Sequence, residues 1–259
     1  MTVNLRSSRE IQKLREAGRI VADVLCKLKE EVKPGVSTGY LDKIAEEMTL
    51  SRGAIALFKG VKSPYARNPF PGAICASVND EVVHGVPSPI VKVKEGDILS
   101  IDFGVQYNGY CGDAAITYAV GKISPLKQRL MDITKKMLDI AIANAAPGVR
   151  WTSIAAKMQS CADAAGFSVV TDFVGHGIGT EMHEEPKVPN FVSPELLRDD
   201  IFLEEGMVLA VEPMVNMGTA SVKTLKDGWT VVTRDGKCSA HFEHTIAIVK
   251  NGCEVLTIV

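Results

Sequence analysis

This chain has no excess of either charge, no long apolar run and no cysteine framework, and each absence removes a class of protein. Its 29 basic and 31 acidic residues give a net charge of −2, and the Lys and Arg residues are scattered along the chain. That balance offers no electrostatic reason to bind nucleic acid or an anionic membrane. No apolar run reaches the length of a membrane span, and the first residues lack the apolar core of a signal peptide. We therefore expect a cytoplasmic protein that binds neither nucleic acid nor a membrane.

The cysteines indicate the same compartment. Six are present, none of them in a C-x-x-C pair, which favours free thiols in a reducing environment over a disulfide framework. The length of 259 residues, 46% of them hydrophobic, suits one large domain or two fused halves.

Two segments that lie 110 residues apart have nearly the same pattern. Residues 95–105 read EGDILSIDFGV and residues 205–215 read EGMVLAVEPMV, with Asp102 and Glu212 at the matching eighth position. An acid inside an otherwise apolar strand costs free energy unless it is paired or bound to a cation. The match therefore predicts a duplicated fold whose two halves direct carboxylates at one centre.

The helices support this duplication. Ser7 and Glu10 form a capping box for a helix that ends before Pro34, and a second helix spans about residues 38–52. In the second half, Ser124 and a proline at the next position start a helix that ends before the proline at 147, and a shorter helix spans about 152–165.

The order helix, Pro-Gly-Val, helix, strands thus occurs twice, and residues 44–48 (IAEEM) match residues 154–158 (IAAKM) at the same offset of 110. Any one match could arise by chance, but three in the same order predict a repeat. We expect a single catalytic domain over 1–259, with halves of approximately 1–122 and 123–259.

A hairpin brings two acids together. Asn108-Gly109 is a strong type I′ turn signal, and it predicts that Asp102 and Asp113 are diagonal neighbours on one face of the sheet, about 7–8 Å apart. Near the end of the chain, residues 235–236 (Asp-Gly) suggest another hairpin, followed by a strand over about 238–249 that carries Glu243.

Several acids and one histidine in unusual settings could form a metal site. Converging carboxylates would repel one another and raise their own pKa values, and divalent ions remove that problem. Two ions that flank a shared water make a nucleophile at neutral pH. An oxygen-rich set with one imidazole favours Mn(II), Fe(II) or Co(II), with Zn(II) as an alternative. The candidate ligands are Asp102, Asp113, His176, Glu212 and Glu243.

At this point the chain resembles a known family, the type I methionine aminopeptidases in their short bacterial or organellar form. The resemblance covers nearly the whole chain, and the joint order and spacing of its motifs is highly specific. The matching stretches are 79–87 (NDEVVHGVP), 100–104 (SIDFG), 112–113 (GD), 175–179 (GHGIG), 183–186 (HEEP), 211–213 (VEP) and 243–245 (EHT).

The resemblance implies a fold and a metal site. The fold is α/β (α+β), the pita-bread fold, with pseudo-twofold duplicated helix-helix-strand halves around a central antiparallel sheet. In the family, the positions that match Asp113 and Glu243 bridge two metal ions. The position of Asp102 binds one ion bidentately, and the positions of His176 and Glu212 bind the other. The two ions would be Co, Mn, Fe, Ni or Zn.

The resemblance also implies catalytic roles. His183 matches a histidine that contacts the scissile carbonyl and stabilises the developing oxyanion. His84 matches one near the scissile nitrogen or the following residue, and Glu212 also serves as a proton shuttle. The free α-amine of the substrate would bind a metal, which restricts cleavage to the N-terminus.

Three residues match the methionine pocket, which should be small and apolar with a soft sulfur contact. These are Phe70, Cys75 and Trp229. Phe70 stands where bacterial members often have tyrosine, Met182 where phenylalanine is common, and Val83 where many have cysteine. These departures affect side-chain and inhibitor preference rather than the reaction.

Simpler interpretations exist for single residues. Asp102 alone could be a capping acid near a glycine, and His176 a loop histidine that the backbone satisfies. His183 could pair with acids at the surface, and the same holds for His84. Cys75 could be only a small core residue, and Trp229 is a core or a pocket aromatic. We expect structural or supporting roles for His241 and His244, which flank a ligand.

The resemblance implies an enzyme that removes the initiator methionine from nascent chains whose second residue is small, by attack of a metal-activated water. A crowded site beyond the scissile bond would reject bulky side chains. We expect a monomer that acts on nascent N-termini at the ribosome in the cytoplasm, with a mature organellar form as an alternative.

Three rival functions share the fold. Xaa-Pro aminopeptidases and prolidases usually have an extra N-terminal domain, for which the capped helix at Ser7 leaves no room. Type II methionine aminopeptidases have a long helical insert, and only 35 residues separate His176 from Glu212. A metal-free binding protein would have lost ligands, and all five are present.

Overall fold

The computed structural model describes residues 3–258 and contains five helices and fifteen strands in that part of the chain. The helices are α1 (Ser8–Glu31), α2 (Thr38–Ser51), α3 (Pro125–Asn144), α4 (Trp151–Ala164) and α5 (Pro194–Arg198). The strands of the first half are β1 (Ile55–Ala56), β2 (Cys75–Val78), β3 (Glu81–Val83), β4 (Ile98–Tyr107) and β5 (Tyr110–Ala119). Those of the second half are β6 (Ser168–Val169), β7 (Gly175–Gly177), β8 (Glu184–Val188), β9 (Val208–Val211), β10 (Met214–Asn216), β11 (Val222–Thr224), β12 (Val231–Thr233), β13 (Ser239–His241), β14 (His244–Val249) and β15 (Gly252–Val255).

The four long helices begin and end within one or two residues of their predicted bounds. Helix α1 has the predicted capping box, in which Ser7 accepts from the backbone of Glu10 and the Glu10 side chain accepts from the backbone of Ser7. The side chain of Ser124 caps α3 in front of its first-turn proline. Each helix buries one apolar face, which for α1 includes Leu14, Val21 and others of the predicted stripe.

The hairpin of β4 and β5 forms in the predicted register. Tyr107 pairs with Tyr110, Gly104 with Asp113 and Asp102 with Ala115. The two loop residues have positive φ, 50° at Asn108 and 79° at Gly109, which is the type I′ geometry that matches strand twist. This turn places the two acids on one face of the sheet.

The repeat is visible in the backbone hydrogen bonds, and it corrects one prediction. The backbone N–H of Gly35 donates to Val93 O in the first half, and that of Gly148 donates to Leu203 O in the second. The two donors follow the first helix of each half and are 113 residues apart, whereas the two acceptors precede the matched strands and are 110 residues apart. The segment between the second helix and the matched long strand has 46 residues in the first half (52–97) and 43 in the second (165–207). The pairing of residues 44–48 with 154–158 is therefore wrong by three positions, because a three-residue difference lies between the matched helices and the matched strands.

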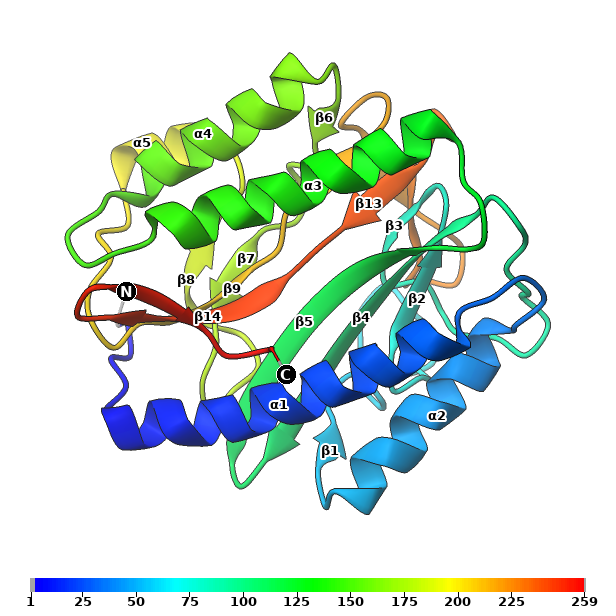
Figure 1. The fold of residues 1–259 in the computed structure, drawn as a ribbon, viewed down its shortest axis with the longest axis horizontal. Helices are drawn as coiled ribbons and strands as arrows, with labels where there is room; N and C mark the ends of the chain where they lie inside the picture. Colours follow the sequence, from blue (N-terminus) through cyan, green and yellow to red (C-terminus); the bar gives the residue numbers. More distant parts are fainter. Residues whose placement is uncertain (1–2, 259) are drawn as a thin grey trace.

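Every strand pair among residues 3–258 is antiparallel, and two sheets form the centre of the molecule. In the first half β1, β2 and β5 flank β4, and in the second the order is β15-β14-β9-β7-β8. Strands β5 and β14 lie side by side where the two halves meet, and we call this line of contact the seam (Figure 1). Glu243 N donates to Ala115 O across this seam, and the Thr245 hydroxyl bridges the backbone N–H and C=O of Asp113.

The second predicted hairpin is wrong. Residues 235–236 do form a turn, but β12 before it pairs with β11 and β3, whereas β13 after it pairs with β10. The predicted strand over 238–249 is also broken into β13 and β14 at Phe242 and Glu243. The turn dipeptide specified the reversal, while the partners of the two strands were set by contacts far away in the sequence.

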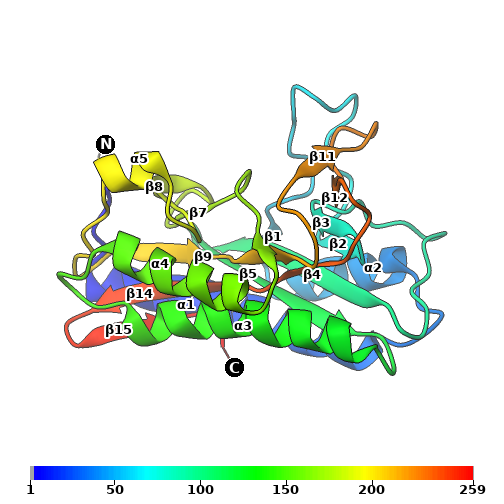
Figure 2. The same cartoon turned by 90° about the horizontal axis from the view of Figure 1, so that it is seen from above.

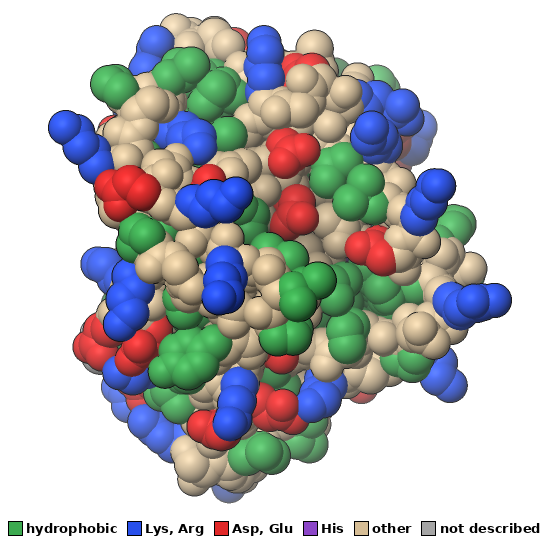
Figure 3. All heavy atoms as spheres, turned by 90° about the vertical axis from the view of Figure 1, so that its right-hand side faces the viewer, with side chains coloured by type: hydrophobic (Ala, Val, Ile, Leu, Met, Phe, Trp, Pro, Cys, Tyr) green, Lys and Arg blue, Asp and Glu red, His purple; other side chains and the backbone are tan. Residues whose placement is uncertain are grey.

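Helices α1 and α3 cover one face of the central strands. Figure 2 shows α1 and α3 on that face, and the segments around β7–β8 and β11–β12 rising from the other. The core divides in the same way as the repeat, with one large apolar cluster under α1 and α2 and another under α3 and α4. On the face drawn in Figure 3, basic side chains are interspersed with acidic and apolar ones.

Two further findings concern the described residues as a whole. No helix within residues 3–258 has both the length and the apolarity to cross a bilayer. All six cysteines are free thiols, as predicted.

The close seating of α1 on β5 gives a stability prediction. A Cβ at Gly112 would lie 2.7 Å from the backbone N of Gly18 in α1, so Gly112→Ala must displace the helix. We expect a loss of about 1–3 kcal/mol in the free energy of unfolding, measured by urea denaturation. The control is Gly53→Asn, where φ is +67° and no neighbour lies within 4 Å, which asparagine tolerates. Equal stability of Gly112→Ala and the control would contradict this packing.

Candidate metal centre

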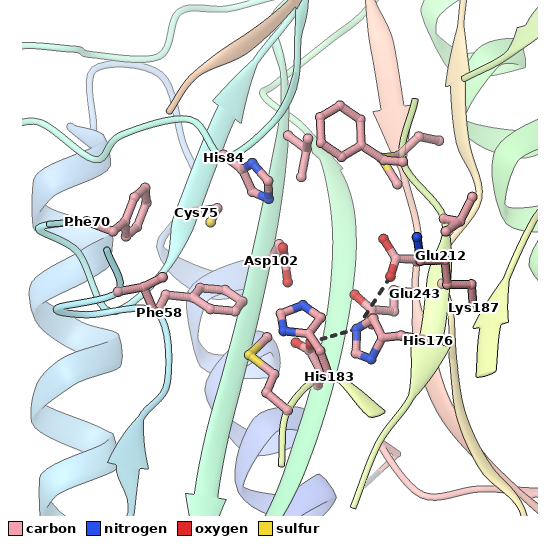
Figure 4. A pocket seen from close by; sticks show the side chains of 18 of the residues that line it. Phe58, Phe70, Cys75, His84, Asp102, His176, His183, Lys187, Glu212 and Glu243 are labelled. Carbon is pink, nitrogen blue, oxygen red and sulfur yellow. Dashed lines mark ion pairs between the residues drawn. The ribbon is translucent and has the colours of Figure 1, made fainter. Parts of the chain in front are cut away.

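A cavity of about 470 Å³ lies where the two halves meet, and its lining includes every candidate residue from the sequence. Figure 4 shows Phe58 and Phe70 at one end, His176, Glu212 and Glu243 at the other, and Asp102 between them. The cavity therefore has an apolar end and an acidic end. The candidate residues that it brings together are Phe70, Cys75, His84, Asp102, Asp113, His176, His183, Glu212, Trp229 and Glu243.

The β4–β5 hairpin supplies two of the carboxylates. Asp102 lies in the middle of β4 and Asp113 in β5, opposite Gly104. A Cβ at Gly104 would lie 3.1 Å from Asp113 Oδ1, so the glycine leaves room for this carboxylate. Both acids project into the cavity because they share a face of the sheet.

His176 occupies β7 between two glycines that the packing requires. A Cβ at Gly175 would lie 2.3 Å from Ala210 O, and one at Gly177 would lie 2.2 Å from Glu185 O. Without side chains, these glycines let β9 and β8 approach β7 closely. His176 Nε2 then lies 3.6 Å from Glu212 Oε1 and 4.0 Å from an oxygen of Asp113.

The two glutamates lie where strands are interrupted. Glu212 follows β9 and precedes Pro213, whose missing N–H ends the ladder, and the carbonyl of Glu212 accepts from the side chain of Asn190. Glu243 lies in the break between β13 and β14, and its backbone N–H donates to Ala115 O at 2.8 Å. These interruptions turn both carboxylates into the cavity.

Burial and mutual repulsion make the acids of this cluster weak. Burial, followed by the charges of neighbouring carboxylates, raises the pKa values of Asp102, Glu212 and Glu243 well above their ordinary values. Burial also raises the pKa of Asp113 to about 7. Four carboxylates in one pocket are stable as anions only if a counter-charge joins them.

His176 does not supply that counter-charge. Burial, and then the nearby His183, lower the pKa of His176 to about 4, so its imidazole is neutral. Its Nδ1 lies 2.9 Å from Gly177 O and therefore carries the proton. The lone pair of Nε2 then faces the carboxylate oxygens of Asp113 and Glu212, an arrangement of acceptors that repel one another unless a cation lies between them.

Unpartnered oxygen atoms test whether a metal fits. Three buried carboxylate oxygens, one each on Asp102, Asp113 and Glu243, have no hydrogen-bond partner in the part of the chain that the structure describes. Ligand atoms of Asp113, His176 and Glu243 lie within 4.8 Å of one another, close enough to share an ion. The residues fit a divalent cation, and the single imidazole among oxygen donors suits an ion harder than copper.

Two further histidines line the cavity. His84 has φ of 58°, a left-handed conformation that is uncommon outside glycine and that recurs at functional sites. Its ring packs edge-on against Phe173 with centroids 5.6 Å apart, and burial lowers its pKa to about 4. His183 is more exposed, and its ring centroid lies 4.4 Å from that of His176. Both are placed to contact a molecule in the cavity.

The apolar end is a compact cluster of side chains. Phe70 and Trp229 pack edge to face with centroids 5.3 Å apart, and the indole N–H of Trp229 donates to Asn68 O. Cys75 is the cross-strand partner of Asp102, so the apolar end adjoins the acidic end directly. Burial raises the pKa of the Cys75 thiol well above its ordinary value, which keeps it uncharged.

Sequence reasoning missed some of this lining. Phe58 is buried in the apolar cluster with Phe70 and Cys75, yet it lies in a loop without a motif, and a single aromatic residue there carries no signal. Met182 enters the sequence prediction as a departure from the family pattern that affects side-chain preference, and not as one of the pocket residues, but it packs against the same cluster. A search of the residues next to the histidine motif could have found Met182. Phe58 could be identified as a lining residue only from the folded structure.

Comparisons with known proteins agree with this geometry. The sequence profile of metallopeptidase family M24 matches residues 12–250. The chain is 47% identical over 257 residues to the methionine aminopeptidase of Aquifex aeolicus (strain VF5), which covers 99% of each chain. It is 48% identical over 252 residues to methionine aminopeptidase 1 of Bacillus subtilis (strain 168), covering 97% of this chain and 98% of that one. The crystal structure of the methionine aminopeptidase from Thermotoga maritima matches with a TM-score of 0.93 at 39% identity, over 100% of both chains.

The buried acids predict how pH affects the metal-free protein. Their raised pKa values mean that the folded state binds more protons than the unfolded state, so stability falls as pH rises. The histidines act in the opposite direction, but only below their ordinary pKa of 6.5. With a chelator, we expect the Tm to fall as pH rises from about 6.5 to about 8.

Metal should remove this dependence. Mn²⁺ at a hundred times its Kd should add about 2.7 kcal/mol to the free energy of unfolding and flatten the pH profile of the Tm. Thermal unfolding with and without the ion measures both effects. A metal-free Tm that is constant or rises over this pH range would show that the carboxylates do not repel one another as described.

Proposed function

The chain belongs to metallopeptidase family M24, and from this membership we propose how its residues remove the N-terminal methionine of a polypeptide. It is a metal-dependent aminopeptidase with the pita-bread fold, since it matches methionine aminopeptidases over nearly their full length. The observation that carries the proposal is the cavity with a carboxylate cluster at one end and an apolar cluster at the other. We propose that the whole chain, 1–259, acts as one catalytic domain.

Five side chains would hold two divalent ions. Asp113 and Glu243 are central in the cluster and would bridge the ions, while Asp102 on one side would complete the first site. His176 and Glu212, whose ligand atoms are 3.6 Å apart, would complete the second. When bound, the ions would neutralise the carboxylates and lower the pKa of a water molecule to near neutrality.

The remaining polar residues would transfer protons and stabilise the charge that develops during the reaction. Glu212 lies at the edge of the cluster and would take a proton from the attacking water, then pass it to the leaving amine as the C–N bond breaks. His183, at the mouth of the cavity, would donate to the carbonyl oxygen as it gains negative charge. His84 would contact the scissile nitrogen or the residue that follows it.

The apolar end would bind the methionine side chain. The rings of Phe58 and Phe70 would contact the thioether of the methionine, and the small Cys75 thiol would contact it as well. Trp229 would border the pocket, held in place by the hydrogen bond from its indole N–H. Because Cys75 pairs with Asp102, a side chain seated here places the first peptide bond beside the carboxylates. The short separation between the apolar end and the carboxylates would therefore direct cleavage to the peptide bond that follows the bound methionine.

The second residue of the substrate should be small. Beyond the scissile bond the substrate would pass His84, which packs against Phe173, and His183. A bulky second side chain would collide with these rings.

Polypeptides that begin with methionine and a small second residue are nascent chains. We therefore propose that a monomer acts on them at the ribosome in the cytoplasm, and the bacterial relatives and the free thiols support that setting.

A peptide panel tests the specificity. We expect the enzyme to cleave Met-Ala-Ser far faster than Met-Leu-Ser, because the second side chain meets the crowded region, and to leave Ala-Pro-Ser intact. EDTA should abolish cleavage, and added Mn²⁺ should restore it. Product formation is measured by chromatography of released methionine. Cleavage of the Xaa-Pro peptide would instead indicate a prolidase, and no cleavage with any metal would indicate a binding protein.

Two variants separate metal binding from substrate contact. Glu243→Ala should lose both metal and turnover, since it removes a bridging carboxylate. His183→Ala should keep its metal but lose roughly a hundredfold in kcat, as expected for one oxyanion contact. Metal content and kcat are measured on the same samples. Normal activity in Glu243→Ala would exclude the bridging role, and loss of metal from His183→Ala would make that histidine a ligand.

A further inference from the structure

The segment before α1 crosses a loop that lines the cavity. This loop, residues 179–184, contributes Met182 of the apolar end and His183 to the lining, and it ends at Glu184, which also borders the cavity. The guanidinium of Arg6 pairs with both oxygens of Glu184, although the two residues are 178 positions apart. Both side chains are only 9% exposed, so this ion pair is largely withdrawn from solvent.

Glu184 holds the loop together as well as binding Arg6. Its carboxylate accepts from the backbone N–H of Thr180 at 2.9 Å, from that of Glu181 at 3.2 Å and from the Asn4 side chain at 2.9 Å. Burial alone would raise the pKa of Glu184, but the hydrogen bonds from Asn4, Glu181 and Arg6 hold it below its ordinary value. The carboxylate is therefore charged and closes the loop on itself.

Arg6 is itself fixed on its other side. Its backbone N–H donates to Gly206 O at 2.7 Å, at the turn before β9, and the next residue is the cap of α1. A Cβ at Gly179 would lie 2.0 Å from Arg6 Nη2, so the glycine provides the space that the guanidinium occupies. Arg6 thus joins a helix, a turn of the second half and the loop.

We infer that the Arg6–Glu184 pair is a clamp that positions His183 and Met182 over the cavity. The inference rests on the proposed function, because it acts through the two residues assigned there to the carbonyl and to the methionine side chain. The clamp lies outside the metal centre, since the loop carries none of the five proposed ligands. Loss of the clamp should therefore impair catalysis and leave metal binding intact, a combination that general destabilisation would not give.

The experiment compares Arg6 with a control arginine, Arg15 in α1. Arg6→Gln removes the charge of the clamp, and Arg15→Gln removes that of the Arg15–Glu254 pair, which is more exposed (27% and 48%) and contacts no cavity residue. In metal-loaded enzyme with a Met-Ala-Ser substrate, Arg6→Gln should lower kcat by about ten- to a hundredfold, because a displacement of about 1 Å can cost that much. It should also raise KM, while metal affinity by calorimetry and the kinetics of Arg15→Gln stay at wild-type values.

A double variant shows whether the clamp acts through His183. In the His183→Ala background, Arg6→Gln should cause little further loss of kcat, because the residue that it positions is absent. Arg6→Lys keeps the charge and should retain an intermediate kcat, and it serves if Arg6→Gln does not fold. Wild-type kcat in Arg6→Gln and Arg6→Lys, a full additional loss in the His183→Ala background, or loss of metal would each overturn the clamp. A wild-type enzyme that does not cleave the peptide would refute the proposed function instead.

Discussion

Repulsion between four carboxylates is the constraint around which this molecule is organised. Asp113 and Glu243 are each only 2% exposed, and the neighbouring His176 is neutral. Among the described residues that line the cavity, Lys187 is the one with a full positive charge, and it lies on the exposed side of β8. The described residues therefore provide no buried counter-charge in the cavity, and a divalent metal ion of the kind that the M24 metallopeptidases use would supply it.

The duplicated architecture explains how the acids come together. Asp102 and Glu212 hold equivalent positions in the two halves, on β4 and just after β9. The halves meet along β5 and β14, where Thr245 bonds both backbone groups of Asp113 and so fixes one half against the other. Each half contributes only part of the proposed ligand set. The apolar end follows from the same sheet, because Cys75 pairs across the strands with Asp102.

Local chemistry could be predicted from the sequence and distant pairing could not. The caps at Ser7 and Ser124 and the turn at Asn108-Gly109 involve residues within a few positions, and the structure has them as predicted. The turn at residues 235–236 failed as a hairpin signal, because β12 and β13 pair with strands from elsewhere. Arg6 and Glu184 meet across 178 residues with no shared motif, so only the fold reveals their contact. The five candidate ligands came from acids and a histidine in unusual settings, and the catalytic and pocket residues came from motif resemblance. The close strand packing around His176 shows why its motif contains Gly175 and Gly177.

Anomalous diffraction from crystals grown with Mn²⁺ tests the central claim most directly. We predict two peaks about 3.5–4 Å apart, with Asp113 and Glu243 contacting both, Asp102 contacting one, and His176 and Glu212 contacting the other. Peaks at other places, or a cavity whose carboxylates remain close together without any ion, would contradict it.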